Sequence, residues 1–578
     1  MNRMEASDKV KRWTDRLQEH EDQLFLVLTI AIGAIVGAVI VAFILLTERL
    51  GTRMYPAGGA AWRRILVPIA GSLLTGYLLF KFFPQARGSG IPQTKTALFV
   101  RNGRILFSTV VGKFFLCSTS LASGIALGRE GPSVQIGAGI ASVLGRKLGL
   151  RPDRVKALVP VGSAAALAAA FNTPIAAVLF TLEEVMGDMH APVLGSIVLS
   201  SATAWMVLHL LLGDNPLFHV QGYQLVHPAE FIIYAILGVL GGLVSVAFVK
   251  LLLWQRKKFL ALPIKTRAFQ PVVGGILVGL LAWKVPAVMG VGYSYVGIAL
   301  NGQMALKLLI LLVVLKLLAT TTCYASGNAG GIFGPSLFIG AMLGGTVGEV
   351  AHHFFPAYTA TAGAYALVGM GTAFAGIIRT PMTSVIMIFE ITRDYTIIVP
   401  LMISNMIAFI LSRKLQPEPI YEALTHQDGI HLPSAEARDR TGKIPVLRAM
   451  RRTAEMLSPE LRTTEALERL QRMGLESWPV GDVKGLWGMI SRKELEEHPA
   501  NLLSELIPRP VAPRDLMAED FPHVHTDHSL DLALQRMGET HLDALPVVSR
   551  ANARELNGVI TLDDVLKAYG VAQPLVSR

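Results

Sequence analysis

Long stretches without a charged residue dominate the first two thirds of the chain. Three runs lack Asp, Glu, Lys and Arg over 24, 26 and 32 positions, at residues 24–47, 157–182 and 317–348, and shorter runs cover 231–249 and 395–412. Because a membrane-spanning helix needs about 20 apolar residues, these runs predict a multi-span helical membrane domain over residues 24–415. Charged residues return densely from residue 416, which predicts a soluble C-terminal part.

Glycine and proline interrupt many of the apolar runs, and broken helices survive in a bilayer only where protein or a water-filled cavity surrounds them. The interruptions repeat. Residues 131–138 read GPSVQIGA and residues 334–341 read GPSLFIGA, with six of eight positions identical at an offset of 203. Residues 161–183 and 368–390 match in the same order at an offset of 207. The membrane domain is therefore predicted to consist of two related halves, about 24–212 and 231–413, with a transport site at the interrupted segments.

The C-terminal part has its own repeat. The letters LQRMG occur at 470–474 and again at 534–538, and each copy is followed by Pro-Val and then by a closing motif, at 488–495 and 558–565. This order predicts a duplicated α/β module. We assign the modules to residues 442–500 and 509–570, joined by the proline-rich stretch 508–513. A linker at 416–441 precedes them, and residues 1–23 form an N-terminal segment.

Composition narrows the class of protein. The 578 residues are 52% hydrophobic and 16% charged, with a mean hydropathy of +0.47, which excludes a disordered chain and an ordinary soluble enzyme. The net charge of +11 is scattered over loops and tail, so lipid headgroups are a better partner than nucleic acid. Cys117 and Cys323 lie in apolar stretches and predict neither a disulfide framework nor a metal site. Without a nucleophile–base pair or a phosphate-binding loop, we expect a transporter and not an enzyme.

Three glycine-rich loops carry candidate chemistry. GSGIP at 88–92 would start a helix and aim free N–H groups and the Ser89 hydroxyl at an anion, although a plain helix-entry turn explains it equally well. GREGP at 128–132 and GIFGP at 331–335 are equivalent in the repeat, yet the position of Glu130 is occupied by Phe333 in the second copy. A capping role would not need that asymmetry, and an ionisable group at membrane depth is a functional candidate by default.

A pair of acids follows the second uncharged run. Glu183 has a repeat mate in Glu390, whereas Glu184 aligns with Ile391. Two acids at a helix end that face water are the plain interpretation, above all for Glu183. An acid present in one half alone again indicates function, so Glu184 is the second candidate.

Together these loops resemble the CLC family of chloride channels and chloride/proton exchangers, and the tail resembles the paired cystathionine-β-synthase (CBS) domains that many members carry. The resemblance implies two inverted helical halves with broken helices, a homodimer and an anion path within each subunit. It implies that Glu130 is the gating glutamate, Glu184 the internal proton glutamate and Lys113 a residue near the pathway. The implied anion-binding residues are Ser89, Gly90, Arg129, Gly131, Gly331, Ile332, Phe333, Gly334 and Tyr421. Gln93 departs from the family, which often has Glu after GSGIP.

The physical logic agrees with this resemblance. A dehydrated chloride needs dipoles and hydroxyls in place of water, and full positive charges would trap it. An ionised Glu130 can occupy the anion's place, while burial and competing chloride favour its neutral form. The leading hypothesis is voltage- or pH-sensitive chloride/proton antiport. A passive gated chloride channel is the alternative, and a membrane-anchored nucleotide sensor that conducts nothing is a third.

The resemblance also bears on the tail and on location. In CBS domains a hydroxyl and an acid of the closing motif hold a ribose, which here points to Thr561 with Asp564 and, less well, Ser491 with Glu494. An adenine nucleotide is thus the one cofactor considered, against a purely structural role for the modules. We expect a multi-pass protein of the cell membrane with both termini in the cytoplasm, in agreement with Arg413 and Lys414 beside the last span.

Overall fold

A computed structural model describes residues 21–189, 193–214, 218, 220, 222–223, 225–394, 396–430, 444–452, 455–473, 475–498, 501–507, 521–540 and 542–569. Most of the predicted N-terminal segment 1–23, positions 431–441 of the predicted linker and the proline-rich stretch 508–513 lie outside the described residues. The chain divides into two compact units, Met1–Leu432 and Pro433–Arg578.

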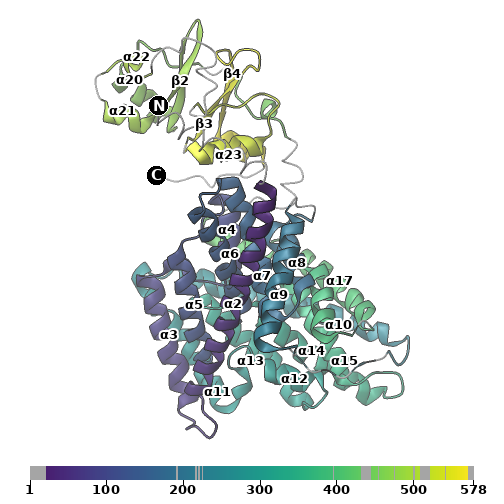
Figure 1. Ribbon diagram of the computed structural model, residues 1–578. Coiled ribbons are helices and arrows are strands. Elements are labelled where there is room, and N and C mark those ends of the chain that lie inside the picture. Colours follow the sequence, from purple (N-terminus) through teal and green to yellow (C-terminus); the bar gives the residue numbers. More distant parts are fainter. Residues whose placement is uncertain are drawn as a thin grey trace, which may run out of the picture. The chain divides into compact units, whose positions relative to one another are not determined.

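The first unit is helical throughout its described part (Figure 1). Its first half contains α2 (Glu21–Met54), α3 (Arg63–Lys81), α4 (Ile91–Val100), α5 (Phe107–Ala122), α6 (Glu130–Lys147), α7 (Pro152–Phe171), α8 (Pro174–Phe180) and α9 (Leu194–Leu212). Its second half contains α10 (Glu230–Leu260), α11 (Pro271–Lys284), α12 (Tyr293–Leu300), α13 (Leu306–Ser326), α14 (Phe333–Phe354), α15 (Ala362–Ile378), α16 (Pro381–Thr392) and α17 (Ile398–Leu415). The short helix α18 (Ile420–Gln427) follows and packs against α4, so the predicted linker begins inside this unit.

The two halves correspond helix by helix. In the first half α2 packs on α9 and α6 on α7; in the second, α10 packs on α17 and α14 on α15. Between the halves α3 packs on α11 and α8 on α16, as an approximate twofold axis requires. The α6–α7 and α14–α15 pairs approach backbone to backbone. A Cβ on Gly137 would lie 2.2 Å from the Gly162 carbonyl oxygen, and one on Gly340 would lie 2.3 Å from that of Gly369. Small residues at such crossings are typical of membrane helices.

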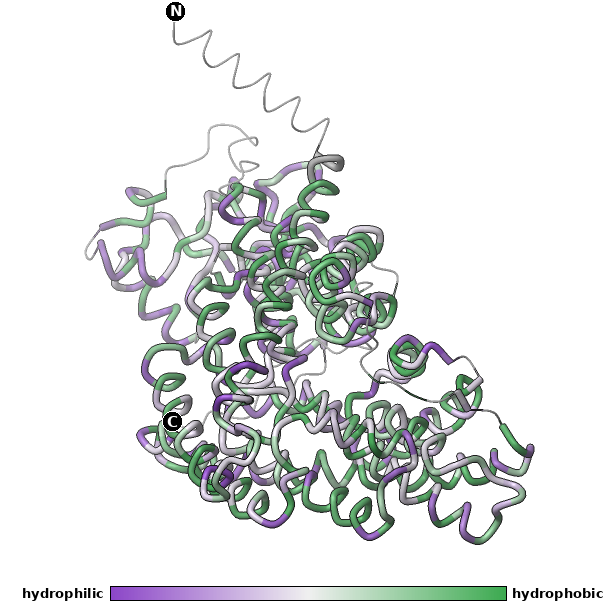
Figure 2. Tube along the Cα trace, turned by 60° about the horizontal axis from the view of Figure 1, so that its bottom comes forward, coloured by the Kyte–Doolittle hydropathy of each residue, from purple (hydrophilic) through white to green (hydrophobic). Residues whose placement is uncertain are grey.

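Seven of the described helices are long and apolar enough to span a membrane. Hydrophobic residues predominate along the helices (Figure 2). The long uncharged runs are not single spans, however. The run 157–182 breaks at Asn172, whose φ is +61°, between α7 and α8, and the run 317–348 breaks between α13 and α14. The fold is therefore a multi-span helical membrane domain with broken helices, as predicted.

The second unit contains two copies of a small α/β module. The first has α20 (Thr463–Met473), β1 (Ser477–Asp482), β2 (Gly485–Ser491), α21 (Arg492–Glu497) and α22 (Leu503–Leu506); the second has α23 (Leu530–Thr540), β3 (Ala544–Val548), β4 (Leu556–Thr561) and α24 (Leu562–Ala568). Strands β1 and β2 pair antiparallel, as do β3 and β4. A parallel bridge joins Leu457 to Val480, and an equivalent bridge 67 residues later joins Val524 to Val547. The predicted duplication is thus present.

Candidate functional site

Three helix starts meet at the centre of the first unit. The loops before α6 and α14 run antiparallel, and Gly128 and Gly331 exchange two backbone hydrogen bonds of 2.7 Å each. The loop before α4 touches the same place, because a Cβ on Gly90 would lie 2.4 Å from the Gly131 carbonyl oxygen. Gly90 also has a φ of +105°, which only glycine adopts readily. The N–H of Gly331, which the sequence placed in the anion site, is engaged in this pairing.

Glu130 is the first residue of α6 and is fully buried. Its Oε2 accepts a hydrogen bond of 3.2 Å from the Gly334 N–H at the start of α14, and its Oε1 accepts one from the Tyr293 hydroxyl. A Cβ on Gly128 would lie 2.3 Å from Oε2. The carboxylate therefore occupies a space that the glycine leaves free, at a helix N-terminus suited to an anion.

Ser89 and Tyr421 place buried hydroxyls near this centre. Ser89 belongs to the loop before α4 and Tyr421 to α18, and both residues are buried. Neither hydroxyl oxygen has a hydrogen-bond partner within the described structure, although Tyr324 on α13 lies beside Ser89. Buried polar groups in proteins are nearly always satisfied, so two such hydroxyls are chemically suited to donating to an anion.

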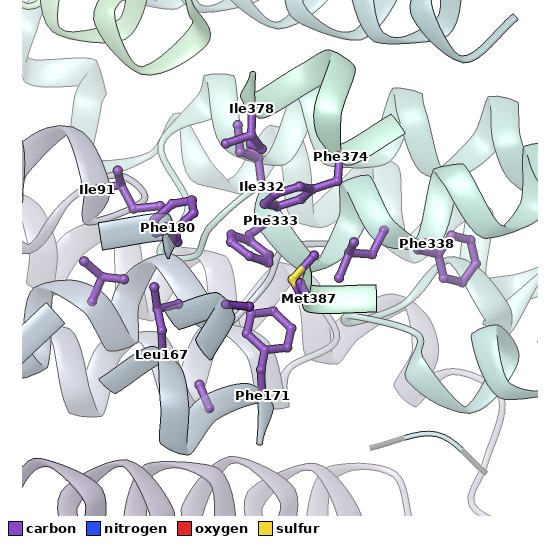
Figure 3. Close-up of a cluster of buried hydrophobic side chains, with 14 of the residues drawn as sticks. Ile91, Leu167, Phe171, Phe180, Ile332, Phe333, Phe338, Phe374, Ile378 and Met387 are labelled. Carbon is purple, nitrogen blue, oxygen red and sulfur yellow. The ribbon is translucent and has the colours of Figure 1, made fainter. Parts of the chain in front are cut away.

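The residues around Phe333 close the site with an aromatic cluster (Figure 3). The Phe333 ring lies 4.4 Å from Phe374, 4.7 Å from Phe171 and 5.4 Å from Phe180, measured between centroids. Ile332 belongs to the same buried core. These side chains exclude water from the helix starts, whose free backbone N–H groups remain the polar surface there.

Arg129 directly precedes Glu130 in the chain. It is 8% exposed, and its Nη1 lies 3.3 Å from Oε1 of Glu48. Its guanidinium carbon sits 5.6 Å from the centroid of the Tyr293 ring. The arginine charge is thus shared with a carboxylate and an aromatic face instead of being aimed alone at the anion position.

Two buried lysines hold the loops that precede α4 and α12. Lys113 donates to the carbonyl oxygens of Ala86 at 2.8 Å and Gly88 at 2.6 Å. Lys316, which sequence reasoning missed, donates to those of Val288 at 3.0 Å and Gly290 at 2.6 Å. The two lysines are 203 residues apart, the offset of the loop repeat, and that offset could have revealed the second one.

The contacts of Gln93 explain why an amide can stand after GSGIP, where the family often has Glu. Its Oε1 accepts from the Gly90 N–H at 2.8 Å and its Nε2 donates to the Arg87 carbonyl at 3.1 Å. An amide can make both bonds at once, whereas a carboxylate has no proton to donate to the carbonyl.

Glu184 is 6% exposed and lies in a π-helical turn, Thr181–Met186, that follows α8. Its Oε1 lies 2.7 Å from Nζ of Lys95, a buried residue on α4, and Glu422 on α18 lies 3.9 Å from the same ammonium. π-helical turns often occur at functional sites. The sequence identified Glu184 but did not assign its cationic partner.

Glu183 does not face water at a helix end, contrary to expectation. Its Oε2 accepts from the N–H and the hydroxyl of Thr383, at 2.9 and 2.7 Å, at the start of α16. Its repeat mate Glu390 accepts from the N–H groups of Ile175 and Ala176, at 2.9 and 2.7 Å, at the start of α8. Each half therefore caps a helix of the other half, which explains why this acid occurs twice.

A cavity of about 350 Å³ opens beside Gly88, Pro92 and Gln93. One carboxylate, Asp428, lies in its wall. The arginines that line it are Arg87, Arg101, Arg104, Arg256 and Arg267. This excess of positive charge would concentrate anions next to the Ser89 loop.

The candidate nucleotide residues of the second unit serve as helix caps. Ser491 with Glu494 and Thr561 with Asp564 form reciprocal capping boxes at the starts of α21 and α24. Arg451 also lies 2.8 and 3.1 Å from the two carboxylate oxygens of Asp564. A ribose that used Asp564 would have to displace this arginine.

Comparisons with known proteins agree with this geometry. A family model described as voltage gated chloride channel matches residues 71–413, and a CBS domain model matches 514–571. The H(+)/Cl(-) exchange transporter ClcA of Vibrio campbellii is 32% identical over 369 residues, which is 63% of this chain and 79% of the relative. The ClcA of Vibrio cholerae is 30% identical over 357 residues, 61% of this chain and 76% of the relative.

Solved structures resemble the fold as well. A slow cyanobacterial Cl⁻/H⁺ antiporter matches with a TM-score of 0.64 and 26% identity, over 70% of this chain and 97% of that one. A eukaryotic CLC transporter matches with a TM-score of 0.67 and 22% identity, over 93% of this chain and 97% of that one. The second likeness bears on the fold alone.

Proposed function

This chain belongs to the voltage-gated chloride channel (CLC) family of membrane transporters, and we propose that it exchanges chloride for protons across a membrane. The observation that carries the proposal is the position of Glu130, whose carboxylate accepts the Gly334 N–H at a buried helix start where a chloride would bind. The exchange activity in the names of its relatives supports the same conclusion.

Chloride would bind at the hydroxyls of Ser89 and Tyr421. These groups have no partner within the described residues, and an anion between them would satisfy both. Hydroxyl and amide dipoles replace the ion's hydration shell without holding it as tightly as a full positive charge would. The arginine-lined cavity beside Gly88 would supply chloride to this position.

Glu130 would couple the two ions. Among the described residues, the Tyr293 hydroxyl and the Gly334 N–H donate hydrogen bonds to its carboxylate, and donors bind a carboxylate more strongly than a neutral acid. Protonation therefore weakens the hold, the side chain leaves, and chloride takes over the released amide. Re-ionisation reverses the step, so proton and chloride alternate at one place.

Glu184 would carry protons between Glu130 and the opposite side of the membrane. The Lys95 ammonium at 2.7 Å would stabilise the ionised carboxylate each time it has released a proton, and the proton would travel by a route distinct from that of chloride. Its occurrence in one half only supports a transport role.

A passive gated chloride channel is the second candidate, because the family description names channels and the anion loops would serve either activity. Glu184 discriminates between them. A channel has no use for an internal proton carrier, whereas an exchanger needs one.

Purified protein in liposomes with an outward chloride gradient provides the test. External pH and chloride are recorded with valinomycin absent and then present. Exchange predicts proton uptake driven by chloride efflux, against the proton gradient. Chloride efflux without proton movement would establish the channel instead. In Glu130→Ala we expect chloride flux to persist and proton coupling to vanish, and coupled protons in that variant would overturn the gating role.

We place the protein in the cell membrane with both termini in the cytoplasm and propose a homodimer. Exposed apolar side chains on α9 and α17, among them Leu210, Met206, Met402 and Ile410, would line the dimer interface or face lipid. Adenine nucleotide binding to the second unit is a further proposal, in which the ribose competes with Arg451 for Asp564.

A further inference from the structure

We propose that Tyr293 is the latch of the gate: a positioning residue whose hydroxyl holds the ionised Glu130 in the chloride position and thereby sets how much acid is needed to release it. This inference rests on the proposed function of Glu130 and adds a regulator of that site from the other half of the chain. Tyr293 lay in no motif that the sequence singled out.

The backbone of Tyr293 is fixed from two sides. It is the first residue of α12 and follows Gly292, whose φ is +85°. A Cβ on Gly292 would lie 2.6 Å from the Phe338 ring, so the loop runs directly against α14. Lys316 ties the preceding carbonyls of Val288 and Gly290 to α13. The helix start that carries the tyrosine therefore has little freedom to move.

The ring of Tyr293 is held as well. The guanidinium of Arg129 lies 5.6 Å from its centroid on one side, and the Phe218 ring meets it edge to face at 5.6 Å. With the ring held in this way, its hydroxyl donates to Oε1 of Glu130. A donor that is ordered in advance gives its hydrogen bond without a further entropic cost.

The contact between Glu130 and Tyr293 has no counterpart at the equivalent positions of the repeat. The mate of Glu130 is Phe333, at an offset of 203, and the mate of Tyr293 is Ile91, at an offset of 202. Ile91 and Phe333 both belong to the buried apolar core and lie in the same cluster (Figure 3). Both pairs join the two halves: Glu130 of the first half meets Tyr293 of the second, and the equivalent positions, Phe333 of the second half and Ile91 of the first, are both apolar. A merely structural tyrosine would not need to change together with the acid.

The expected consequence is a shift in the pH profile. The hydroxyl stabilises the ionised, blocking carboxylate and loses most of that interaction when the acid is protonated. Removing it should allow Glu130 to leave at a lower proton concentration, by about tenfold, since a hydrogen bond to a charged group is worth about that factor or more. The half-maximal pH of chloride flux would then move upward by about one unit.

Tyr293→Phe keeps the ring and removes only the hydroxyl. Chloride efflux and proton uptake are measured in liposomes across a series of pH values for the wild type, for Tyr293→Phe and for Tyr295→Phe. Tyr295 lies on the same helix, and its hydroxyl is not among the described donors to Glu130, so this control should keep the wild-type profile. We expect the upward shift in Tyr293→Phe alone. An unchanged profile in Tyr293→Phe, or an equal shift in the control, would overturn the latch.

A double-mutant comparison separates the latch from a folding role. In the Glu130→Ala background there is no carboxylate to hold, so adding Tyr293→Phe should leave chloride flux unchanged. A further loss of flux there would mean that the tyrosine supports the fold and would also overturn the proposal. Uncoupled chloride flux in the wild type would refute the proposed exchange, while the pH shift in Tyr293→Phe would still decide the latch.

Discussion

Glu183 and Glu184 are adjacent in the chain, and we expect the first to contribute to stability and the second to proton transport. In Glu183→Ala, the Thr383 N–H and hydroxyl at the start of α16 lose their acceptor. The Met382 N–H is at an exposed position, so the partly buried Thr383 N–H is the donor that stays unsatisfied. We expect chloride/proton exchange to keep its coupling in the protein that remains folded.

The magnitude follows from these contacts. An unsatisfied buried donor costs about 1–3 kcal/mol. The lost interaction of a carboxylate with a helix N-terminus adds about 1 kcal/mol. Together they predict a loss of about 2–4 kcal/mol in Glu183→Ala. Glu183→Gln keeps an oxygen acceptor and loses the charge, so its loss should be close to the second contribution alone.

Stability is measured by heating the protein in detergent micelles and monitoring the folded fraction by size-exclusion chromatography. The liposome assay measures the coupling of proton to chloride movement. Glu390→Ala is the matched control, because Glu390 caps α8 through two bonds of 2.7–2.9 Å and should cost a similar amount. Wild-type stability in Glu183→Ala together with lost proton coupling would refute the capping argument and make Glu183 a transport residue.

Three more outcomes are expected. Glu184→Gln should stop proton transport while chloride still moves, and normal proton uptake would remove Glu184 from the path. In the second unit, burial lowers the pKa of His523 and His528 below the usual 6.5, so the neutral folded form is favoured and stability falls on acidification below about that pH. The hydrogen-exchange protection factors of residues 521–548 in the full chain, which are exchange rates corrected for the intrinsic rate at each pH, should therefore fall between about pH 7 and 5.5, and unchanged protection factors would contradict this. Arg451→Ala should tighten adenosine binding by about tenfold, because the ribose no longer competes for Asp564; equal affinity in both proteins would show that the arginine is no obstacle.

Periodicity and repetition predicted most of the fold. Apolar runs long enough to span a bilayer, broken by Gly and Pro at matching offsets, predicted a membrane domain of two related halves with interrupted helices. The same comparison separated acids present once from the acid present twice. The expectation that Glu183 faces water at a helix end was wrong, because local sequence could not show that the start of α16 lies against the end of α8.

Contacts between distant segments could not be read from the chain. The pairing of Lys95 with Glu184 spans 89 residues and that of Tyr293 with Glu130 spans 163. Neither pair has a spacing that helix or strand geometry brings together. Lys316 could be predicted in part. Its offset of 203 from Lys113 is visible in the sequence, but only the structure shows that it donates to loop carbonyls.

The sequence by itself determined the membrane domain, its duplication, the three glycine-rich loops and the asymmetry of Glu130. These properties depend on local composition and on spacing along the chain. The tertiary structure alone decided what touches the carboxylates and which hydroxyls are left without partners. Such contacts arise where segments distant in the chain fold against each other, within one half for Lys95 and Glu184 and between the halves for Tyr293 and Glu130. One-dimensional periodicity carries no information about these contacts.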